Sequence, residues 1–197
     1  MSLAQSSLSP YLPNDDLKEA ARQILASVGE DPEREGLQDT PRRVAESLAY
    51  LTEGYGVSPR QVVRNALFHH EGEDLVAVRD IPFYSLCEHH LLPFFGRCHI
   101  GYLPAGKIVG ISKLPRLVDV FAHRLQLQER LTRQLAEAID EVVSPRGVAV
   151  VMEGRHLCVE MRGVEKLDSN TVTSCLIGEF RDNAAVRAEF LDLVHRK

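Results

Sequence analysis

The segment LVAVRDIPFYSLCEHHLLPFFGRCHIGYLPAGKIVGIS, residues 75–112, indicates the fold class of this 197-residue chain. It is rich in β-branched and aromatic residues, and turn-forming residues interrupt it at short intervals, as is typical of successive β-strands. We therefore predict three strands in this segment, over Leu75–Cys87, Gly96–Leu103 and Lys107–Ser112.

Helical periodicity surrounds these strands. Upstream, apolar stripes and start signals predict three helices, from Asp15 or Asp16 to just before Gly29, from Thr40-Pro41 to about Gly54, and from Ser58-Pro59 to about Leu67. Downstream, we predict a helical stretch over about Pro115–Val143 that is broken near Leu125–Leu127, strands over Val148–Met152, His156–Met161 and Thr171–Glu179, and a last helix over about Ala184–Val194. Hairpins with paired helices make an α+β fold. We expect a flexible arm over residues 1–13, a helical region over 14–70 and a further domain over 71–197.

Charge and composition exclude several classes of protein. The formal net charge of −5 does not suit a general nucleic-acid binder. The chain has no apolar run of the ~20 residues that cross a bilayer, and its first residues lack the basic start and apolar stretch of a secretory signal. We therefore expect a cytoplasmic protein that binds neither nucleic acid nor membrane. Its four cysteines would remain reduced, and we interpret Cys98 and Cys175 as core residues.

Two compact groups of cysteine and histidine stand out, Cys87-Glu88-His89-His90 and His156-Leu157-Cys158. A Cys-x-x-His turn can bring both side chains to one ion, and a His-x-Cys pair in a strand would place both side chains on one face. Thiolate and imidazole are ligands that zinc prefers. We assign zinc to Cys87, His90 and Cys158, which leaves His89 and His156 as general acids or bases. Ligand count alone leaves open a closed structural site with four ligands.

Several basic residues suggest an anionic substrate. Ser112-Lys113 and Arg116 lie where a strand is predicted to end and a helix to begin, and free backbone N–H groups at such a point bind anions. Arg162 lies four residues beyond Cys158, and Arg43 lies in the first turn after Thr40-Pro41. Beside a zinc site, these residues suit a polyphosphate. For any one of them, a solvated surface charge is the competing interpretation.

The pair Gln128-Glu129 opens the later predicted helix. A carboxylate beside an amide can recognise the N–H groups of a purine such as guanine. The helix dipole also favours an acidic residue at a helix N-terminus. The residues alone leave these two interpretations equal.

Two other motifs are set aside. Residues 101–107 fit half of a phosphate-binding loop, but Ile108 stands where Ser or Thr must bind magnesium and the next segment is predicted to be a strand. We expect a hairpin turn there. A nucleoside deaminase is disfavoured because the P-C-x-x-C half-site is absent and Glu88 does not follow the H-x-E pattern.

Longer runs carry a family resemblance: SLCEHHLLPFFGRCHIGYLP (85–104), VGISKLPRLVDVFAHRLQLQERLT (109–132), HLCVEMRGVEK (156–166) and TVTS (171–174). In this order and spacing they closely resemble GTP cyclohydrolase I, and the likeness extends over roughly residues 31–195. The resemblance implies a tunnelling fold (T-fold), in which antiparallel sheets from several subunits close into a barrel with helices packed outside. It also implies a homodecamer of two pentamers with active sites at subunit interfaces.

The resemblance implies conversion of GTP and water to 7,8-dihydroneopterin triphosphate and formate, the first step of tetrahydrofolate and pterin biosynthesis, with Zn²⁺ as cofactor. The implied zinc ligands are Cys87, His90 and Cys158, and the implied catalytic histidines are His89 and His156. The implied substrate contacts are Glu129 for guanine with Gln128 beside it, and, for the triphosphate, Ser112, Lys113, Arg116 and Arg162, with Arg43 from a neighbouring subunit.

The implied reaction adds water at C8 of the purine and opens the imidazole ring with a proton from His156 or His89. A second water releases C8 as formate, and an Amadori rearrangement of the ribose then allows closure of the dihydropterin ring. The sequence does not assign the two histidines to individual proton transfers. Glu46 stands where some family members carry a phosphate-binding lysine. The alternative function is a non-catalytic, zinc-stabilised oligomeric binding module. Loss of zinc would let Cys87 and Cys158 form a disulfide.

Overall fold

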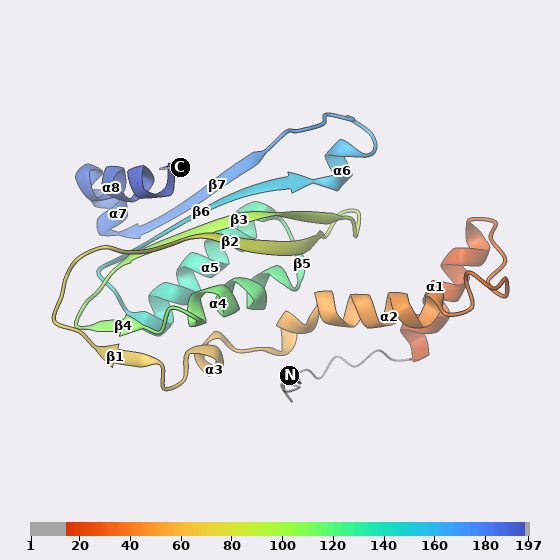
Figure 1. Ribbon diagram of the computed structural model, residues 1–197, viewed down its shortest axis with the longest axis horizontal. Helices are drawn as coiled ribbons and strands as arrows, with labels where there is room; N and C mark the ends of the chain where they lie inside the picture. Colours follow the sequence, from red (N-terminus) through yellow and green to blue (C-terminus); the bar gives the residue numbers. More distant parts are fainter. Residues whose placement is uncertain (1–14, 196–197) are drawn as a thin grey trace.

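The computed structural model describes residues 15–195 and shows an α+β fold built on one five-stranded sheet (Figure 1). The strands lie in the order β5-β2-β3-β6-β7. Their bounds are Val76–Cys87 for β2, Pro93–Leu103 for β3, Leu125–Gln126 for β5, Gly147–His156 for β6 and Thr171–Gly178 for β7. Neighbouring strands from β2 to β7 are antiparallel, whereas the short β5 runs parallel to the end of β2. The predicted α+β class is confirmed.

Two helices, α4 Lys113–Ala122 and α5 Gln128–Val143, cover one face of this sheet (Figure 1). Alternate side chains of β3 point towards them, and Phe94, Cys98 and Ile100 are fully buried there, because successive strand residues face opposite sides of a sheet. Cys175 of β7 packs against the same core. The structural interpretation of Cys98 and Cys175 is therefore correct.

The opposite face is covered at one end by α7 Glu179–Asp182 and α8 Ala184–His195. Phe180 and Phe190 are buried there with Leu103, and the two ring centroids lie 5.7 Å apart. Towards the end of β2, this face carries exposed side chains, among them Tyr84, which stacks on Phe95 of β3.

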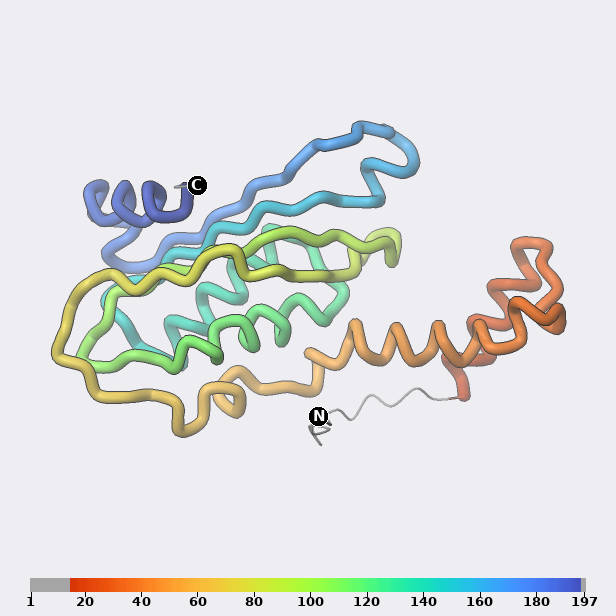
Figure 2. The backbone as a smooth tube through the Cα atoms, viewed as in Figure 1, coloured from red at the N-terminus to blue at the C-terminus, as the bar shows by residue number. Residues whose placement is uncertain are grey.

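The N-terminal helices α1 Asp15–Ser27 and α2 Thr40–Leu51 pack against each other and project away from the sheet (Figure 1, Figure 2). A proline stands in the first turn of α2, as its start signal predicted. The turn η1 Glu53–Gly56 and the short helix α3 Pro59–Val63 lead back to the body. The arm expected over residues 1–13 lies outside the described residues.

The helix predicted from Ser58 to about Leu67 is too long. It ends at Val63, and Arg64 follows with a φ of 38°, a conformation that ends a helix. Leu67–His69 then forms a strand, β1, that pairs with β4 Lys107–Val109. The strand predicted over Lys107–Ser112 is shorter than expected, because β4 ends at Val109. The hairpin turn expected at residues 101–107 is wrong, because β4 pairs with β1 instead of β3.

The strand predicted over His156–Met161 is wrong. β6 ends at His156, and Leu157–Glu160 forms one helical turn, α6, in which the Met161 N–H donates to the Leu157 carbonyl at 3.0 Å. In a strand, Leu157, Val159 and Met161 would share one apolar face, but this face does not form, since Met161 is 62% exposed. Glu160 is buried in its place because Arg155 donates hydrogen bonds of 2.8 and 2.7 Å to its carboxylate.

The predicted break near Leu125–Leu127 is confirmed, because β5 separates α4 from α5. α4 begins at Lys113, two residues earlier than expected. Over residues 15–195, the part of the chain that the structure describes, no helix is both long and apolar enough to span a membrane.

Candidate active site

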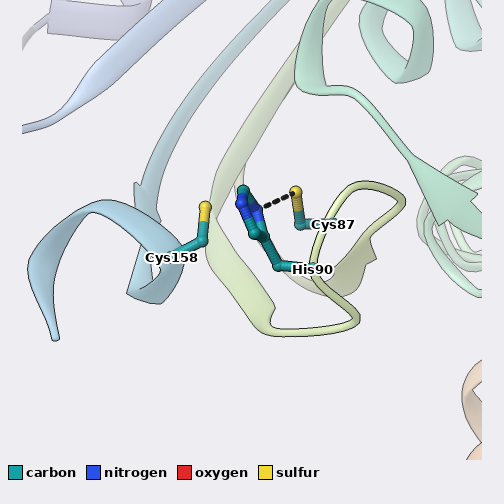
Figure 3. A group of neighbouring side chains, drawn as sticks. All are labelled: Cys87, His90 and Cys158. Carbon is teal, nitrogen blue, oxygen red and sulfur yellow. Dashed lines mark hydrogen bonds between the residues drawn. The ribbon is translucent and has the colours of Figure 1, made fainter. Parts of the chain in front are cut away.

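The first half of the cysteine–histidine cluster lies in the turn that joins β2 to β3. Cys87 ends β2, and its backbone carbonyl accepts hydrogen bonds from the N–H groups of His90 at 3.3 Å and Leu91 at 2.8 Å. Leu91 has a φ of 54°, which reverses the chain direction towards β3. As a result, the His90 ring stands beside the Cys87 thiol, with Nδ1 3.7 Å from Sγ (Figure 3).

The second half of the cluster is Cys158 of α6. This helical turn packs against β3, and in Figure 3 the His90 ring lies between the sulfur atoms of Cys87 and Cys158. One potential ligand atom from each of the three residues lies within 4.8 Å of the other two. The structure thus brings together the three residues to which the sequence assigned zinc.

The chemistry of this donor set fits zinc, whose preferred ligands are thiolate and imidazole. Burial is the larger of two effects that raise the pKa of the Cys158 thiol, and the neighbouring Cys87 thiol is the other. The second effect arises because two adjacent thiolates repel each other unless a positive charge lies between them. A divalent cation supplies that charge. Among residues 15–195 the cluster contains three such side chains, the number typical of a catalytic zinc site with one open position.

His156 stands beside the cluster at the end of β6 and is half-buried. Its ring is nearly parallel to that of Phe94, at an angle of 3° and a centroid separation of 4.7 Å. Its Nε2 lies 2.9 Å from Oε1 of Gln128. Burial lowers the pKa of His156, while the charges of Glu129 and Glu160 act in the opposite direction. This environment favours the neutral imidazole.

His89 lies in the same turn as His90, but its side chain is 63% exposed and its ring is almost perpendicular to that of His90. Its Nε2 is 3.8 Å from a carboxylate oxygen of Glu88. Glu88 also pairs with Arg130 of α5, and a hydrogen bond from this guanidinium lowers the pKa of Glu88. The pair fixes the ligand-bearing turn to α5.

Glu129 and Arg162 approach the same region from two elements. Glu129 is exposed in the first turn of α5, and its charge acts on His156. Arg162 is exposed two residues after α6, and its charge favours the thiolate of Cys158. Both side chains therefore lie near the metal cluster and are accessible to a ligand.

Other predicted anion-binding residues lie elsewhere in the chain. Lys113 and Arg116 line a cavity of about 450 Å³ beside η1 and α3, and no residue of the metal cluster lines it. The far end of α4 is the one near the cluster, since the Ser85 hydroxyl donates to the Ala122 carbonyl at 2.6 Å. Lys113 lies at the opposite end of this helix, roughly 14 Å away along its axis.

Arg43 is further removed, because it lies on the projecting helix α2 (Figure 1). It is exposed and pairs with Asp39 at 3.3 Å, whereas Glu46 pairs with Arg42 at 2.9 Å. Ser112 is exposed immediately before α4. A single copy of the chain therefore brings the metal cluster, His156, Glu129 and Arg162 together but leaves the other predicted contacts apart.

Comparison with known proteins identifies the family. A model of the family described as GTP cyclohydrolase I matches residues 17–195. The chain belongs to the GTP cyclohydrolase I family. This membership implies the T-fold, and the α+β architecture described above agrees with it.

Named members of the GTP cyclohydrolase I family are similar along most of this chain. GTP cyclohydrolase 1 of Gloeobacter violaceus is 56% identical over 183 residues, which are 93% of this chain and 86% of that protein. GTP cyclohydrolase 1 of Methylococcus capsulatus is 56% identical over 89% of this chain and 95% of that protein. Among solved structures, apo archaeosine synthase QueF-Like aligns with a TM-score of 0.46 and 19% identity, over 55% of this chain and 97% of that one.

Several residues around this GTP cyclohydrolase I site were not predicted from the sequence. Phe94 stacks on His156 because the two residues are directly opposite in the β3–β6 register. Thr173 of β7 contacts the Gln128 amide at 3.1 Å, and Thr132 contacts Thr173 at 2.7 Å. For the two threonines the sequence signal is a polar residue inside an apolar element, whereas nothing in the sequence marks Phe94, because its role depends on strand register.

Proposed function

We propose that this chain is a zinc-dependent GTP cyclohydrolase I that converts GTP and water to 7,8-dihydroneopterin triphosphate and formate. The observation that carries the proposal is the three-residue cluster of Cys87, His90 and Cys158 in a chain of this family, with the neutral imidazole of His156 beside it. The three side chains would hold the ion. Zinc, when bound, supplies Lewis acidity that lowers the pKa of water towards ~7.

In this proposal, His156 and His89 move the protons of the reaction. His156 has a ring plane fixed by stacking on Phe94, and burial favours its neutral form, which can take a proton from a reacting group and return it. His89 is exposed in the ligand-bearing turn, where it can exchange protons with solvent. Phe94 excludes water from one face of the His156 ring.

The same proposal assigns guanine recognition to Glu129, with Gln128 beside it, because an exposed carboxylate can accept hydrogen bonds from the ring N–H and amino groups of guanine. Arg162, whose charge acts on Cys158, would contact the triphosphate from the metal side. Ser112, Lys113 and Arg116 would contact it from a second copy of the chain, and Arg43 from the projecting α2 of another. Arginine and lysine suit this role because they pair strongly with phosphate oxygens.

We further propose a homo-oligomer, a decamer of two pentamers in which T-fold sheets close into a barrel. Two observations support assembly. The residues predicted to bind one substrate lie in separate parts of one copy. Among residues 15–195, β7 has a sheet neighbour on one side only, and β5 covers only Leu86 and Cys87 of β2. Open strand edges of this kind favour pairing with another chain. We also propose a cytoplasmic location, with no nucleic acid or membrane as partner. The proposed domains are a helical region over residues 14–70 and a catalytic domain over residues 71–197.

The test is a mass-spectrometric analysis of products after the zinc-loaded protein is incubated with GTP. We expect dihydroneopterin triphosphate and formate in equal amounts, and we expect a chelator to stop both. Intact GTP, with zinc bound and the oligomer assembled, would contradict the proposal and favour the alternative of a zinc-stabilised binding module.

A further inference from the structure

The hydrogen-bond partners of the buried Gln128 side chain determine which end of its amide is the oxygen and which is the nitrogen. Gln128 is fully buried, and its Nε2 lies 3.1 Å from the Met152 carbonyl and 2.8 Å from the Thr171 carbonyl. A carbonyl oxygen can only accept a hydrogen bond. The amide NH₂ must therefore face these two oxygens, and Oε1 must face His156.

Two threonines make the same assignment independently. The Thr132 hydroxyl donates to the Gln128 backbone carbonyl at 2.7 Å, and this bond uses its one hydrogen. In the 2.7 Å contact between the two hydroxyls, Thr173 must then be the donor. Having donated its hydrogen, the Thr173 oxygen accepts from Nε2 of Gln128 at 3.1 Å. The two amide hydrogens thus face three oxygens that can only accept, so the orientation of the amide is fixed.

Gly154 of β6 leaves the space that the amide needs. A Cβ atom at this position would lie 2.5 Å from Oε1 of Gln128, well inside van der Waals contact. The oxygen is therefore held between the glycine and the imidazole, 2.9 Å from Nε2 of His156. Stacking on Phe94 fixes the plane of the same ring.

We infer that Gln128 is a positioning residue that holds His156 as the Nε2–H tautomer and leaves Nδ1 as the nitrogen that exchanges a proton with the substrate. An amide oxygen accepts a hydrogen bond from Nε2–H in both the neutral and the charged ring, so the hydrogen on Nε2 stays in place. The inference rests on the proposed function for the identity of the substrate, and it adds the role of one residue in the proposed reaction. It changes the expected role of Gln128 from base recognition to control of His156.

A direct contact between Gln128 and the purine would require the amide to leave its present partners. Both amide hydrogens and the amide oxygen are engaged within the chain, and a buried polar group that loses its partner costs about 1–3 kcal/mol. Glu129, the next residue, is exposed and can bind the base without breaking a buried hydrogen bond. Recognition of the base therefore falls to Glu129.

The first test is a nitrogen NMR spectrum of the zinc-loaded full-length protein labelled with ¹⁵N-histidine, in which His156→Asn identifies the His156 signals. We expect a protonated Nε2 and an unprotonated Nδ1 in the neutral ring. In Gln128→Met, which removes the acceptor but keeps the side-chain length, the fixed tautomer should give way to a mixture. Gln126→Met is the matched control, because it removes a second buried amide that contacts Phe121, Gln134 and Arg130 instead of His156, and it should leave the His156 signals unchanged.

A protonated Nδ1 in the unaltered protein would overturn the inference, and this outcome needs no variant to fold. Equally, unchanged His156 signals in folded Gln128→Met would overturn it. These signals do not depend on turnover. A protein that converts GTP but has the reversed tautomer would contradict the inference and support the proposed function. A protein that has the expected tautomer but leaves GTP intact would support the inference and contradict the proposed function.

The second test separates positioning from substrate contact by kinetics. Gln128→Met should lower kcat about 10²-fold, the lower range for a misplaced general acid or base, with KM for GTP changed by less than about threefold. A rise in KM with unchanged kcat would assign Gln128 to substrate binding and overturn the inference.

Discussion

Burial and the adjacent Cys87 thiol raise the pKa of the Cys158 thiol, and this effect makes the site favour a cation. Both causes disfavour the thiolate of Cys158 in the metal-free chain. The charge of Arg162 opposes this preference, and a cation bound between the two sulfur atoms would reverse it because it attracts both anions. Each thiolate is therefore needed both for affinity and for the chemistry that the ion supplies.

We predict that Cys158→Ser loses bound zinc and GTP conversion together, with activity falling at least about 10³-fold because two remaining ligands cannot hold a catalytic zinc. Metal content by mass spectrometry and formate release measure the two losses. The matched control is Cys175→Ser, which replaces a half-buried thiol outside the cluster and should retain zinc. Full activity in metal-free Cys158→Ser would show that the reaction does not use this ion.

Glu129 gives a second prediction for a single residue. If its carboxylate accepts hydrogen bonds from guanine, Glu129→Gln should lower kcat/KM for GTP roughly tenfold to a hundredfold, because hydrogen bonds to a charged group contribute about 1.5–3 kcal/mol. Glu137→Gln makes the same change at an exposed position of the same helix and is the control. Equal kinetics in the two variants would remove Glu129 from guanine recognition.

Single residues were also the scale at which the sequence was most informative. Cys87, His90 and Cys158 could be grouped by residue type and spacing, and the structure places their ligand atoms within 4.8 Å. Phe94 and Thr173 could not be found in this way. Their roles depend on which residues of β3, β6 and β7 lie opposite each other, and this register is a property of the folded sheet.

At the scale of secondary-structure elements, the failed prediction of a strand over His156–Met161 has a physical cause. Alternating apolar residues favour a strand only if one face becomes buried. Here the buried group is the Glu160 carboxylate, which Arg155 satisfies with two hydrogen bonds. The pair joins the end of β6 to α6, the turn from which Cys158 faces His90 (Figure 3). By contrast, the helices α4 and α5 bury apolar stripes, so their periodicity was a reliable signal.

The β-bulge in β2 predicts a pH-dependent stability. The register shifts between Val78 and Ile81, and the Asp80 N–H donates to Nδ1 of the buried His99 at 3.2 Å. Burial lowers the pKa of His99, while Asp80 and Glu153 oppose this effect and His195 and Arg79 reinforce it. A protonated Nδ1 cannot accept the Asp80 hydrogen bond.

Because the folded-state pKa of His99 lies below the unfolded value, the stabilisation is present above a pH of about 6.5 and is lost as the pH falls through the folded-state pKa. The slope that one proton contributes is at most about 1.4 kcal/mol per pH unit. His99→Gln keeps an acceptor for Asp80 and should show a smaller loss of stability towards low pH, measured by urea unfolding. The exposed His69→Gln is the control and should follow the unaltered chain. An identical pH profile for His99→Gln would assign the dependence to other groups.

At the scale of the whole molecule, the arrangement of the predicted site gives assembly a functional role. The metal cluster, His156 and Arg162 belong to one end of the sheet, whereas Lys113 and Arg116 line a separate cavity at the other end of α4. The sequence alone could not reveal this separation, because it depends on the direction of α4 relative to β2. If one GTP contacts both groups of residues, each site must combine two copies of the chain.

This division predicts complementation between inactive variants. Cys158→Ser should disable the metal half of a site and Arg116→Ala the phosphate half, so each oligomer alone should be inactive. In an equal mixture assembled at random, about a quarter of the sites would pair an intact metal half with an intact phosphate half across a heterologous interface, and activity should recover to about that fraction. Formate release from co-expressed chains measures the recovery. A mixture of Cys158→Ser with His156→Ala should recover nothing, because both changes disable the metal half. Absence of recovery in the first mixture, with mixed oligomers present by native mass spectrometry, would mean that one chain supplies both halves of its own site.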